Sequence, residues 1–277
     1  MSDPQAWMKN TSEQPPAPEI DTTVAHSARV YDYWLGGKDN FEADRALGDA
    51  MIRAIPSLPA MAKANRAFLS RAVRYLVSET GVRQFLDIGT GIPTAGNVHE
   101  IAQQVAPESR VLYIDHDPIV LAHARALMTS TSDGRTEFIM ADLREPESIV
   151  SAPELAKTLD LQQPVALMLV AILMYFHDQE GVYEWVSTLV EALPAGSYVA
   201  ITHPTADFDA DAVSGAVAAA TQAGITLVPR SKSDVERFFD GLDVIDPGVV
   251  PVLSWHPDEP VDDPNAARYW AGVARKP

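Results

Sequence analysis

The chain has 277 residues, of which 47% are hydrophobic and 21% charged, as is ordinary for a globular protein. This length predicts one large domain, or one domain with an elaborated end, that buries a core without covalent staples. The 38 acidic residues outnumber the 21 Lys and Arg, so the formal net charge is −17. Such acidity disfavours nucleic acids and anionic membranes as partners, because both are bound through basic patches.

The absence of cysteine excludes disulfides, thiolate metal sites and cysteine nucleophiles. Residues 1–10 contain Asp3 and no apolar core, so we expect no signal peptide. The longest apolar run, residues 165–176, is shorter than the roughly 20 residues of a membrane helix. We therefore expect a cytoplasmic protein without a membrane partner.

The pattern of the sequence divides the chain into three parts. Residues 1–20 are rich in proline and lack periodicity, so we predict a flexible arm. Residues 21–80 show helical patterns and are predicted to form a helical extension or lid. Residues 81–277 alternate between strand and helix patterns and are predicted to form one α/β domain.

Three helices are predicted in the extension. The first spans residues 27–35 and is ended by a glycine pair, and the second spans 40–55 with Asp39 or Asn40 as its N-cap. The third begins near Pro59 and has an apolar stripe that is expected to face the core, made by Phe68, Ala72, Val73 and Leu76.

From residue 84 onward, short apolar strands alternate with helical segments. The strands are predicted over 84–88, 110–114, 137–141, 165–170 and 198–202. This alternation, with strand ends roughly 25–30 residues apart, predicts a doubly wound, mostly parallel sheet. Three later strand-like segments lie too close together for crossover helices, so an antiparallel pair at the sheet edge is expected. They cover residues 242–245, 249–255 and 269–274.

A glycine-rich turn follows the first predicted strand. Gly89 and Gly91 permit a tight turn and a close backbone approach to a ligand. Thr94 stands where a dinucleotide fingerprint has its third glycine, and no P-loop lysine follows. Asp87, just before the turn, would repel a pyrophosphate and attract a ligand that carries an ammonium or sulfonium group.

Two more carboxylates stand at the ends of neighbouring strands. Asp115 closes the second strand, where a carboxylate can accept hydrogen bonds from ribose hydroxyls. Asp117 precedes Pro118 and suits the N-cap of the next helix better than Asp115 does. Asp142 closes the third strand and could accept from an adenine amine while the Leu143 amide donates to the ring; a helix cap is the alternative for Asp142.

Together these motifs resemble the class I S-adenosylmethionine-dependent methyltransferases. Asp87-x-Gly-x-Gly, Asp115 and Asp142 match the first three motifs of that class, and the tail resembles its antiparallel last strands. More narrowly, residues 28–41 and 85–94 resemble one bacterial S-adenosyl methyltransferase family that began as a domain of unknown function. The resemblance covers roughly residues 20–277, and the one departure from the broad class is Pro93 in place of a third glycine.

This resemblance implies a Rossmann-like fold with a seven-stranded sheet and S-adenosylmethionine as cofactor, with S-adenosylhomocysteine as its product. It also implies a set of cofactor-binding residues that follows the family's motifs. They are Asp87, Gly89, Thr90, Gly91, Asp115, His116, Asp142, Leu143 and Val170. Asn65 and Arg66, upstream of the first strand, are the candidates for binding the methionine carboxylate, and a position on the helix surface is the alternative for Arg66.

The acceptor side of the predicted site is less defined. Aromatic residues gather within residues 31–41 and suggest a lid over the sulfonium, with packing onto the sheet as the alternative. Tyr33 and His203, which follows the fifth strand, are the candidate catalytic residues, and His177 is second to His203 as a base. No group of residues has the spacing of metal ligands, so we predict no metal.

We therefore predict an S-adenosylmethionine-dependent methyltransferase with a small-molecule acceptor. Two alternatives stay open: a catalytically silent cofactor-binding regulator and a nicotinamide-dependent oxidoreductase. We expect no nucleic-acid partner, and a homodimer is compatible with the sequence. The acidic surplus between His203 and Asp263 favours a neutral or cationic acceptor over a polyanion.

Overall fold

The computed structural model describes residues 21–277, apart from the side chains of residues 125–127; the predicted arm, residues 1–20, lies outside the described residues. Its centre is a parallel sheet of five strands. They are β1 (Gln84–Ile88), β2 (Arg110–Asp115), β3 (Arg135–Met140), β4 (Ala166–Val170) and β5 (Tyr198–Pro204). The order β3-β2-β1-β4-β5 reverses direction between β1 and β4, and this confirms the doubly wound topology. Ligands bind at such a switch point, beyond the carboxyl ends of the strands.

The sheet continues into an antiparallel edge. Strand β8 (Tyr269–Arg275) pairs antiparallel with β5, as the tail pattern predicts. The outer edge of β8 pairs with two short strands, β6 (Asp243–Val244) and β7 (Val250–Pro251). The predicted strands 242–245 and 249–255 shorten to these two fragments of two residues each, so the sheet has eight strands instead of the seven that the resemblance implies.

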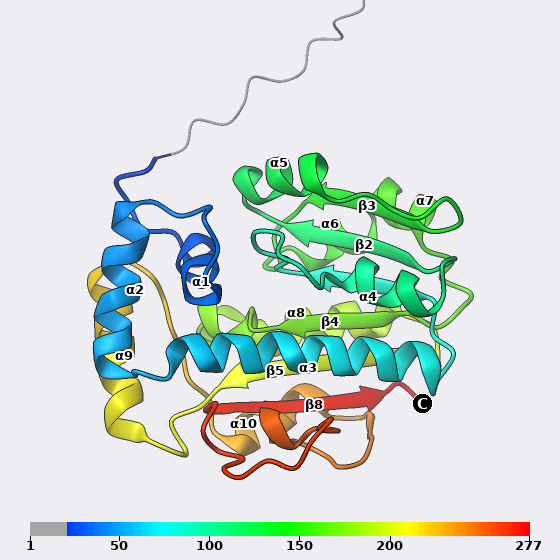
Figure 1. Ribbon diagram of the computed structural model, residues 1–277. Coiled ribbons are helices and arrows are strands. Elements are labelled where there is room, and N and C mark those ends of the chain that lie inside the picture. The colour runs from blue at the N-terminus through cyan, green and yellow to red at the C-terminus, as the bar shows by residue number, and fades with distance from the viewer. Residues whose placement is uncertain (1–20) are drawn as a thin grey trace, which may run out of the picture.

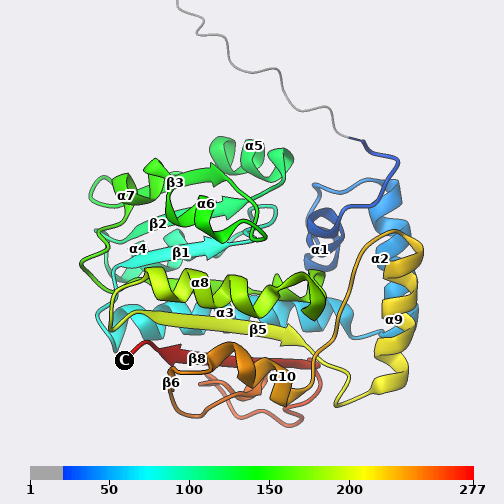
Figure 2. The same ribbon diagram turned by 180° about the vertical axis from the view of Figure 1, so that it is seen from behind.

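Helices cover both faces of the sheet (Figures 1 and 2). One face carries α3 (Leu58–Ser78), α4 (Val98–Val105) and α5 (Pro118–Leu127). The other face carries α6 (Pro146–Val150), α7 (Pro153–Thr158), α8 (Val182–Ala192) and α10 (Lys232–Glu236). Successive strand residues face opposite cores, as the pleat requires: Phe85 packs with α3 and Leu86 with the α8 layer.

The predicted extension forms three helices, two of which stand at the carboxyl end of the sheet. Helix α1 (Ser27–Leu35) ends at Gly36, whose φ of 84° is the left-handed conformation that glycine adopts easily. Helix α2 (Glu42–Ala54) lies beside α9 (Ala210–Gln222), as Figure 1 shows. Helix α3 runs along the sheet and buries its predicted apolar stripe completely. The strand arrows of β1 to β5 in both views point toward α1.

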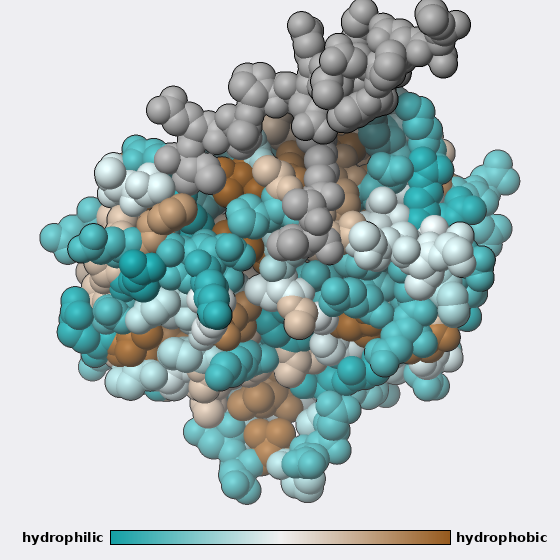
Figure 3. All heavy atoms as spheres, turned by 45° about the horizontal axis from the view of Figure 1, so that its top comes forward, coloured by the Kyte–Doolittle hydropathy of each residue, from teal (hydrophilic) through white to brown (hydrophobic). Residues whose placement is uncertain are grey.

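The exterior in Figure 3 is mainly hydrophilic, with hydrophobic residues in small separate patches. Such scattered apolar exposure is normal for a folded chain. In the part of the chain that the structure describes, none of the helices combines the length and the apolar character needed to cross a membrane.

Candidate active site

A cavity of about 460 Å³ opens where the strand order reverses, at the carboxyl ends of β1, β2 and β4. Its volume falls within the roughly 300–1,000 Å³ that is typical of ligand pockets. The floor is the turn after β1, and α1 and α3 close it from the other side. Most of the predicted cofactor-binding residues lie in its lining: Asn65, Arg66, Asp87, Gly89, Thr90, Gly91, Asp115, His116 and Val170.

The two glycines of the turn after β1 are needed for different reasons. Both have positive φ, 74° at Gly89 and 65° at Gly91, which disfavours any residue with a Cβ. A Cβ on Gly89 would lie 2.5 Å from the Ile172 side chain, so packing also excludes a larger residue there. A Cβ on Gly91 would meet no atom within 4 Å. Gly91 therefore leaves open space for a ligand beside its backbone.

Asp87 places a buried carboxyl group in this cavity. Burial raises its pKa to about 7, an effect that nearby Arg66 opposes and that Asp115 reinforces. No hydrogen bond from the described residues contributes to stabilising its charged form. An uncompensated buried carboxylate is costly, and a cationic donor from a ligand would offset that cost.

Two backbone amides hold Asp115 in place, one from the turn after β1 and one from the loop after β2. Its carboxylate accepts from the amides of Gly91 and Asp117, each at 3.0 Å. Burial nevertheless raises its pKa. The Asp117 carboxylate accepts from the Ile119 amide at 2.7 Å and caps α5, which confirms the predicted N-cap role of Asp117. Asp115 thus lines the cavity in a fixed orientation.

A smaller cavity of about 40 Å³ continues the first one past the end of β3. Asp142 and Leu143 line it together with apolar side chains such as Ile114. Arg144 donates from Nε to both carboxylate oxygens of Asp142 at 3.0 Å, and this ion pair lowers the pKa of Asp142. The Asp142 carboxylate is therefore already engaged by its neighbour, which the sequence did not predict.

A series of side-chain hydrogen bonds links β5 to α3 and α3 to α1 beside the cavity. The Thr202 hydroxyl on β5 donates to Asn65 at 2.6 Å, and the Asn65 amide donates to the Tyr31 hydroxyl at 2.9 Å. Arg66 donates to the Gly96 carbonyl at 2.7 Å, beyond the glycine turn. These contacts join α1, α3 and the sheet around one cavity.

Comparison with known proteins identifies the family of this chain. Residues 13–277 match the S-adenosyl methyltransferase family. The chain belongs to this family. S-adenosylmethionine is therefore its cofactor, and methyl transfer is its class of reaction.

Solved structures support this assignment. A DUF574 family protein from Streptomyces avermitilis is 47% identical, with a TM-score of 0.91 over 94% of this chain and 100% of the other. A candidate methyltransferase from Thermobifida fusca is 41% identical, with a TM-score of 0.86 over 96% and 99%. A methyltransferase from Anabaena variabilis, only 13% identical with a TM-score of 0.50 over 94% and 97%, shares the fold. Among curated proteins, none matches the chain.

The two candidate catalytic residues of this S-adenosyl methyltransferase lie outside the cavity. His203 points to the opposite face of the sheet from Thr202, where it is completely buried and its ring contacts Arg230 at 2.7 Å. Burial lowers its pKa to about 3, so it stays neutral. The ring of Tyr33 packs against Gly48 of α2, and its hydroxyl donates to Asp49 at 2.7 Å. Strand and helix periodicity direct both side chains away from the site, which corrects the expectation for each.

Two tyrosines that the sequence does not single out for catalysis line the cavity instead. Tyr31 lies on the α1 face opposite Tyr33, and burial raises its pKa. Tyr175 follows β4, and its pKa is also raised by burial. Helical spacing would have indicated that Tyr31 and Tyr33 face different ways. No signal marks Tyr175, which stands inside an apolar run.

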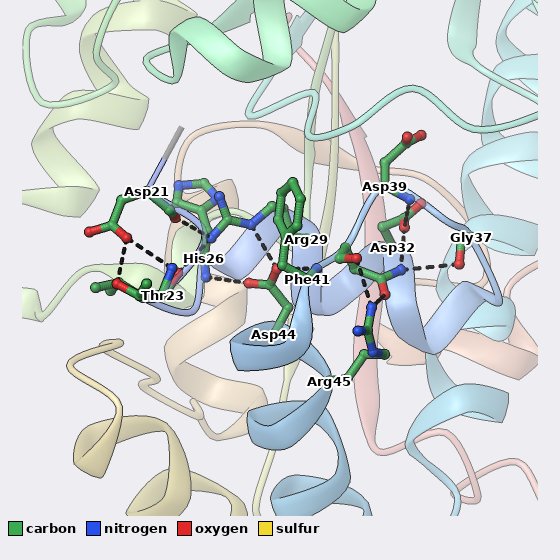
Figure 4. Close-up of polar contacts among 12 residues, drawn as sticks. Asp21, Thr23, His26, Arg29, Asp32, Gly37, Asp39, Phe41, Asp44 and Arg45 are labelled. Carbon is green, nitrogen blue, oxygen red and sulfur yellow. Dashed lines mark hydrogen bonds and ion pairs between the residues drawn. The ribbon is translucent and has the colours of Figure 1, made fainter. Parts of the chain in front are cut away.

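A buried carboxylate fixes α1 above the cavity (Figure 4). Asp44 of α2 accepts from the amides of His26 and Phe41 and from Nε of Arg29, each at 2.8 Å. These bonds join the start of α1 to the start of α2. Phe41 is therefore the N-cap position of α2, not Asp39 or Asn40 as predicted, because Asp44 reaches back to its amide.

Proposed function

We propose that this chain transfers the methyl group of S-adenosylmethionine to a small-molecule acceptor. The observation that carries the proposal is the pair of buried carboxylates, Asp87 and Asp115, at the switch point of the sheet. Asp87 has no hydrogen-bond partner within residues 21–277 and Asp115 is held by two amides, so the two carboxylates suit a ligand that combines an ammonium group with a ribose. The residues around them fit the cofactor of the family.

The proposed roles of the cofactor-binding residues follow from their positions. Asp87 holds the ammonium group, and Asp115 accepts from the ribose hydroxyls. The backbone of the turn from Gly89 to Gly91 lies beside the ribose and methionine parts, where the free space next to Gly91 supports close approach. Arg66 stands near Asp87 and is the proposed partner of the methionine carboxylate.

The adenine end is proposed for the small cavity beyond β3. Ile114 and Leu143 contribute apolar walls, and His116 lies at the junction of the two cavities. Asp142 already binds Arg144, so we propose that the adenine amine shares this carboxylate with the guanidinium. Val170 lines the larger cavity near the end of β4.

Methyl transfer depends mainly on alignment and on the removal of water. The bound cofactor supplies a methyl group on a positively charged sulfur. Tyr31, held by Asn65, and Tyr175 present aromatic surface at the cavity, and the raised pKa of each keeps its hydroxyl neutral at pH 7. Neutral phenols exclude water and orient an acceptor by hydrogen bonding, without adding a charge that would compete with Asp87.

Replacing Asp115 tests this assignment. In Asp115→Ala the affinity for S-adenosylhomocysteine should fall by about 100-fold, because hydrogen bonds to a buried carboxylate contribute about 1.5–3 kcal/mol each. Isothermal titration calorimetry measures the change. Asp133→Ala, which removes an exposed carboxylate distant from the cavity, is the charge-matched control and should bind normally. Near-normal affinity in Asp115→Ala would contradict the proposed site.

A further inference from the structure

His26 joins the helical extension to the α/β domain at the edge of the cofactor cavity. It is the residue before α1, and its amide donates to the Asp44 carboxylate at 2.8 Å (Figure 4). Its ring contacts the α/β domain, where Nε2 donates to the Asp117 carboxylate at 3.0 Å. The backbone of His26 is therefore fixed by α2, and its ring is fixed by the N-cap residue of α5.

The other ring nitrogen of His26, Nδ1, has no partner in this arrangement. Within residues 21–277, this atom is buried and makes no hydrogen bond. The Asp117 carboxylate can only accept, so the neutral ring carries its proton on Nε2 and leaves Nδ1 as an acceptor. A buried acceptor without a donor is costly, and a donor group of a ligand would offset that cost.

This free acceptor lies beside the proposed ribose site. His26 and Asp115 both line the cavity of about 460 Å³. They are also linked through Asp117, whose amide donates to Asp115 at 3.0 Å and whose carboxylate accepts from His26. Asp117 therefore connects the carboxylate at the end of β2 to the imidazole of the extension.

A ribose hydroxyl suits Nδ1 of His26 better than the adenine amine does. The smaller cavity beyond β3, which is proposed for adenine, is lined by Asp142 but not by His26. A ribose held at Asp115 carries two adjacent hydroxyl groups, and each of them can donate one hydrogen bond. The ribose therefore brings the donor that Nδ1 lacks.

We propose that His26 is a further cofactor-binding residue, whose Nδ1 accepts a hydrogen bond from one ribose hydroxyl of S-adenosylmethionine. This inference rests on the proposed function. Asp115 holds the ribose from the sheet and His26 holds it from the extension, so His26 selects a ribonucleoside over a deoxyribonucleoside. The start of α1 is then part of the cofactor site, and cofactor binding stabilises the position of α1.

Two substitutions separate the two nitrogens of His26. The Gln amide reaches about as far as Nε2, so His26→Gln keeps the contact with Asp117 and loses the acceptor at Nδ1. The shorter Asn amide stands near the position of Nδ1, so His26→Asn keeps an acceptor for the hydroxyl and loses the contact with Asp117. His256→Gln, at an exposed histidine outside the cavity lining, is the matched control.

Calorimetry should compare the binding of S-adenosylhomocysteine with that of its 2′-deoxy and 3′-deoxy analogues. His26→Gln should bind S-adenosylhomocysteine about fivefold more weakly than the wild type, because one hydrogen bond is lost. Removing the hydroxyl that Nδ1 binds should then cost this variant about fivefold less affinity than it costs the wild type. His26→Asn should show the wild-type loss for that analogue, and His256→Gln should match the wild type throughout.

Hydrogen-exchange mass spectrometry of the ligand-free protein is the second measurement. Amide exchange in α1 should be as slow in His26→Gln as in the wild type, and faster in His26→Asn, which loses the contact with Asp117. If thermal unfolding shows that His26→Gln does not fold, His26→Ala replaces it in the comparison of the analogues.

Equal losses of affinity in the wild type and His26→Gln for both deoxy analogues would overturn this inference, because His26 would then act on neither hydroxyl. Exchange in α1 that is equally fast in His26→Gln and His26→Asn, with no difference between the analogues, would show a purely structural role. The two proposals fail differently. A wild-type protein that binds no S-adenosylhomocysteine overturns the proposed function, whereas one that binds it without coupling between His26 and a ribose hydroxyl overturns only the role of His26.

Discussion

Asp87 combines burial, a raised pKa and a position in the cofactor cavity. Its pKa of about 7 means that near neutral pH the carboxyl group is only partly ionised before a ligand arrives. Arg66 is the nearby positive charge, and Asp115 is the nearby group that opposes ionisation. Groups with a perturbed pKa are typical of functional sites, because the ligand supplies the charge or hydrogen-bond partner that the protein does not provide.

We therefore predict that cofactor affinity depends on pH through Asp87. An ammonium group binds the carboxylate form, so below pH 7 binding must first remove a proton, and affinity falls about tenfold per pH unit well below the pKa. S-adenosylhomocysteine should bind about 50-fold more weakly at pH 5 than at pH 7. Calorimetry in buffers of different ionisation enthalpy measures both the affinity and the released proton.

Asp87→Asn is the control for this prediction. The variant should bind weakly and lose most of the pH dependence; a profile as steep as that of the wild type would contradict the role of Asp87. The pH dependence of the free energy of unfolding, compared between the wild type and Asp87→Asn, gives a second check. The folded protein keeps the Asp87 proton up to about pH 7, while the unfolded chain loses it near pH 4, so this group's contribution to stability decreases as pH rises through that window. At pH 8 the variant should therefore be no less stable than the wild type.

At the scale of elements, α1 forms one wall of the cavity at the switch point. Helix α1 is short, and helices of this length are not stable alone, so its contacts must hold it. The Asp44 carboxylate supplies two of them, to the His26 amide and to Nε of Arg29, and is completely buried, as is most of Arg29. His26, next to α1, also contacts Asp117 of the α5 cap at 3.0 Å. Asp44 and Asp117 therefore link the start of α1 to the starts of α2 and α5.

Asp44→Asn should lower the free energy of unfolding by about 3–5 kcal/mol, because it leaves the buried Arg29 without its counter-charge. It should also speed amide hydrogen exchange in α1 more than in β1. Urea unfolding and exchange mass spectrometry measure these effects. Asp49→Asn removes the exposed partner of Tyr33 and should change stability by less than about 0.5 kcal/mol. Equal effects of the two variants would show that Asp44 does not hold α1.

At the scale of the whole molecule, ligand binding and folding are linked. The proposed site for S-adenosylhomocysteine is built by residues of the strand ends, α1 and α3, so this ligand should bind the folded state alone. At a concentration 100 times its dissociation constant it should stabilise the protein by about 2.7 kcal/mol. A nicotinamide dinucleotide should not, since Asp87 faces its pyrophosphate and Thr94 replaces the third glycine of a dinucleotide fingerprint.

Differential scanning fluorimetry with both ligands checks this prediction. An upward shift of the melting temperature with S-adenosylhomocysteine only is the expected result. An equal shift with the nicotinamide cofactor would favour the oxidoreductase alternative. Inorganic phosphate at the same ionic strength controls for general salt effects.

The sequence by itself determined the sheet, the family and the motif residues that meet in the cavity. Segments such as β1 and α1 occupy the predicted residues, because local hydrophobic spacing decides which segments form strands and helices. The motif residues Asp87, Gly89, Gly91 and Asp115 meet in one cavity because all follow strands whose carboxyl ends lie at the switch point.

Only the tertiary structure decided which side chains after β4 and β5 line the cavity. His203 and Thr202 are adjacent in sequence, yet they lie on opposite faces of β5, and the direction of each depends on the register of the sheet. Tyr175 lines the cavity because the segment after β4 meets α1 there, and the partners of the two short edge strands, β6 and β7, are set by their pairing with β8. These are contacts between segments far apart in the chain, so no local pattern encodes them.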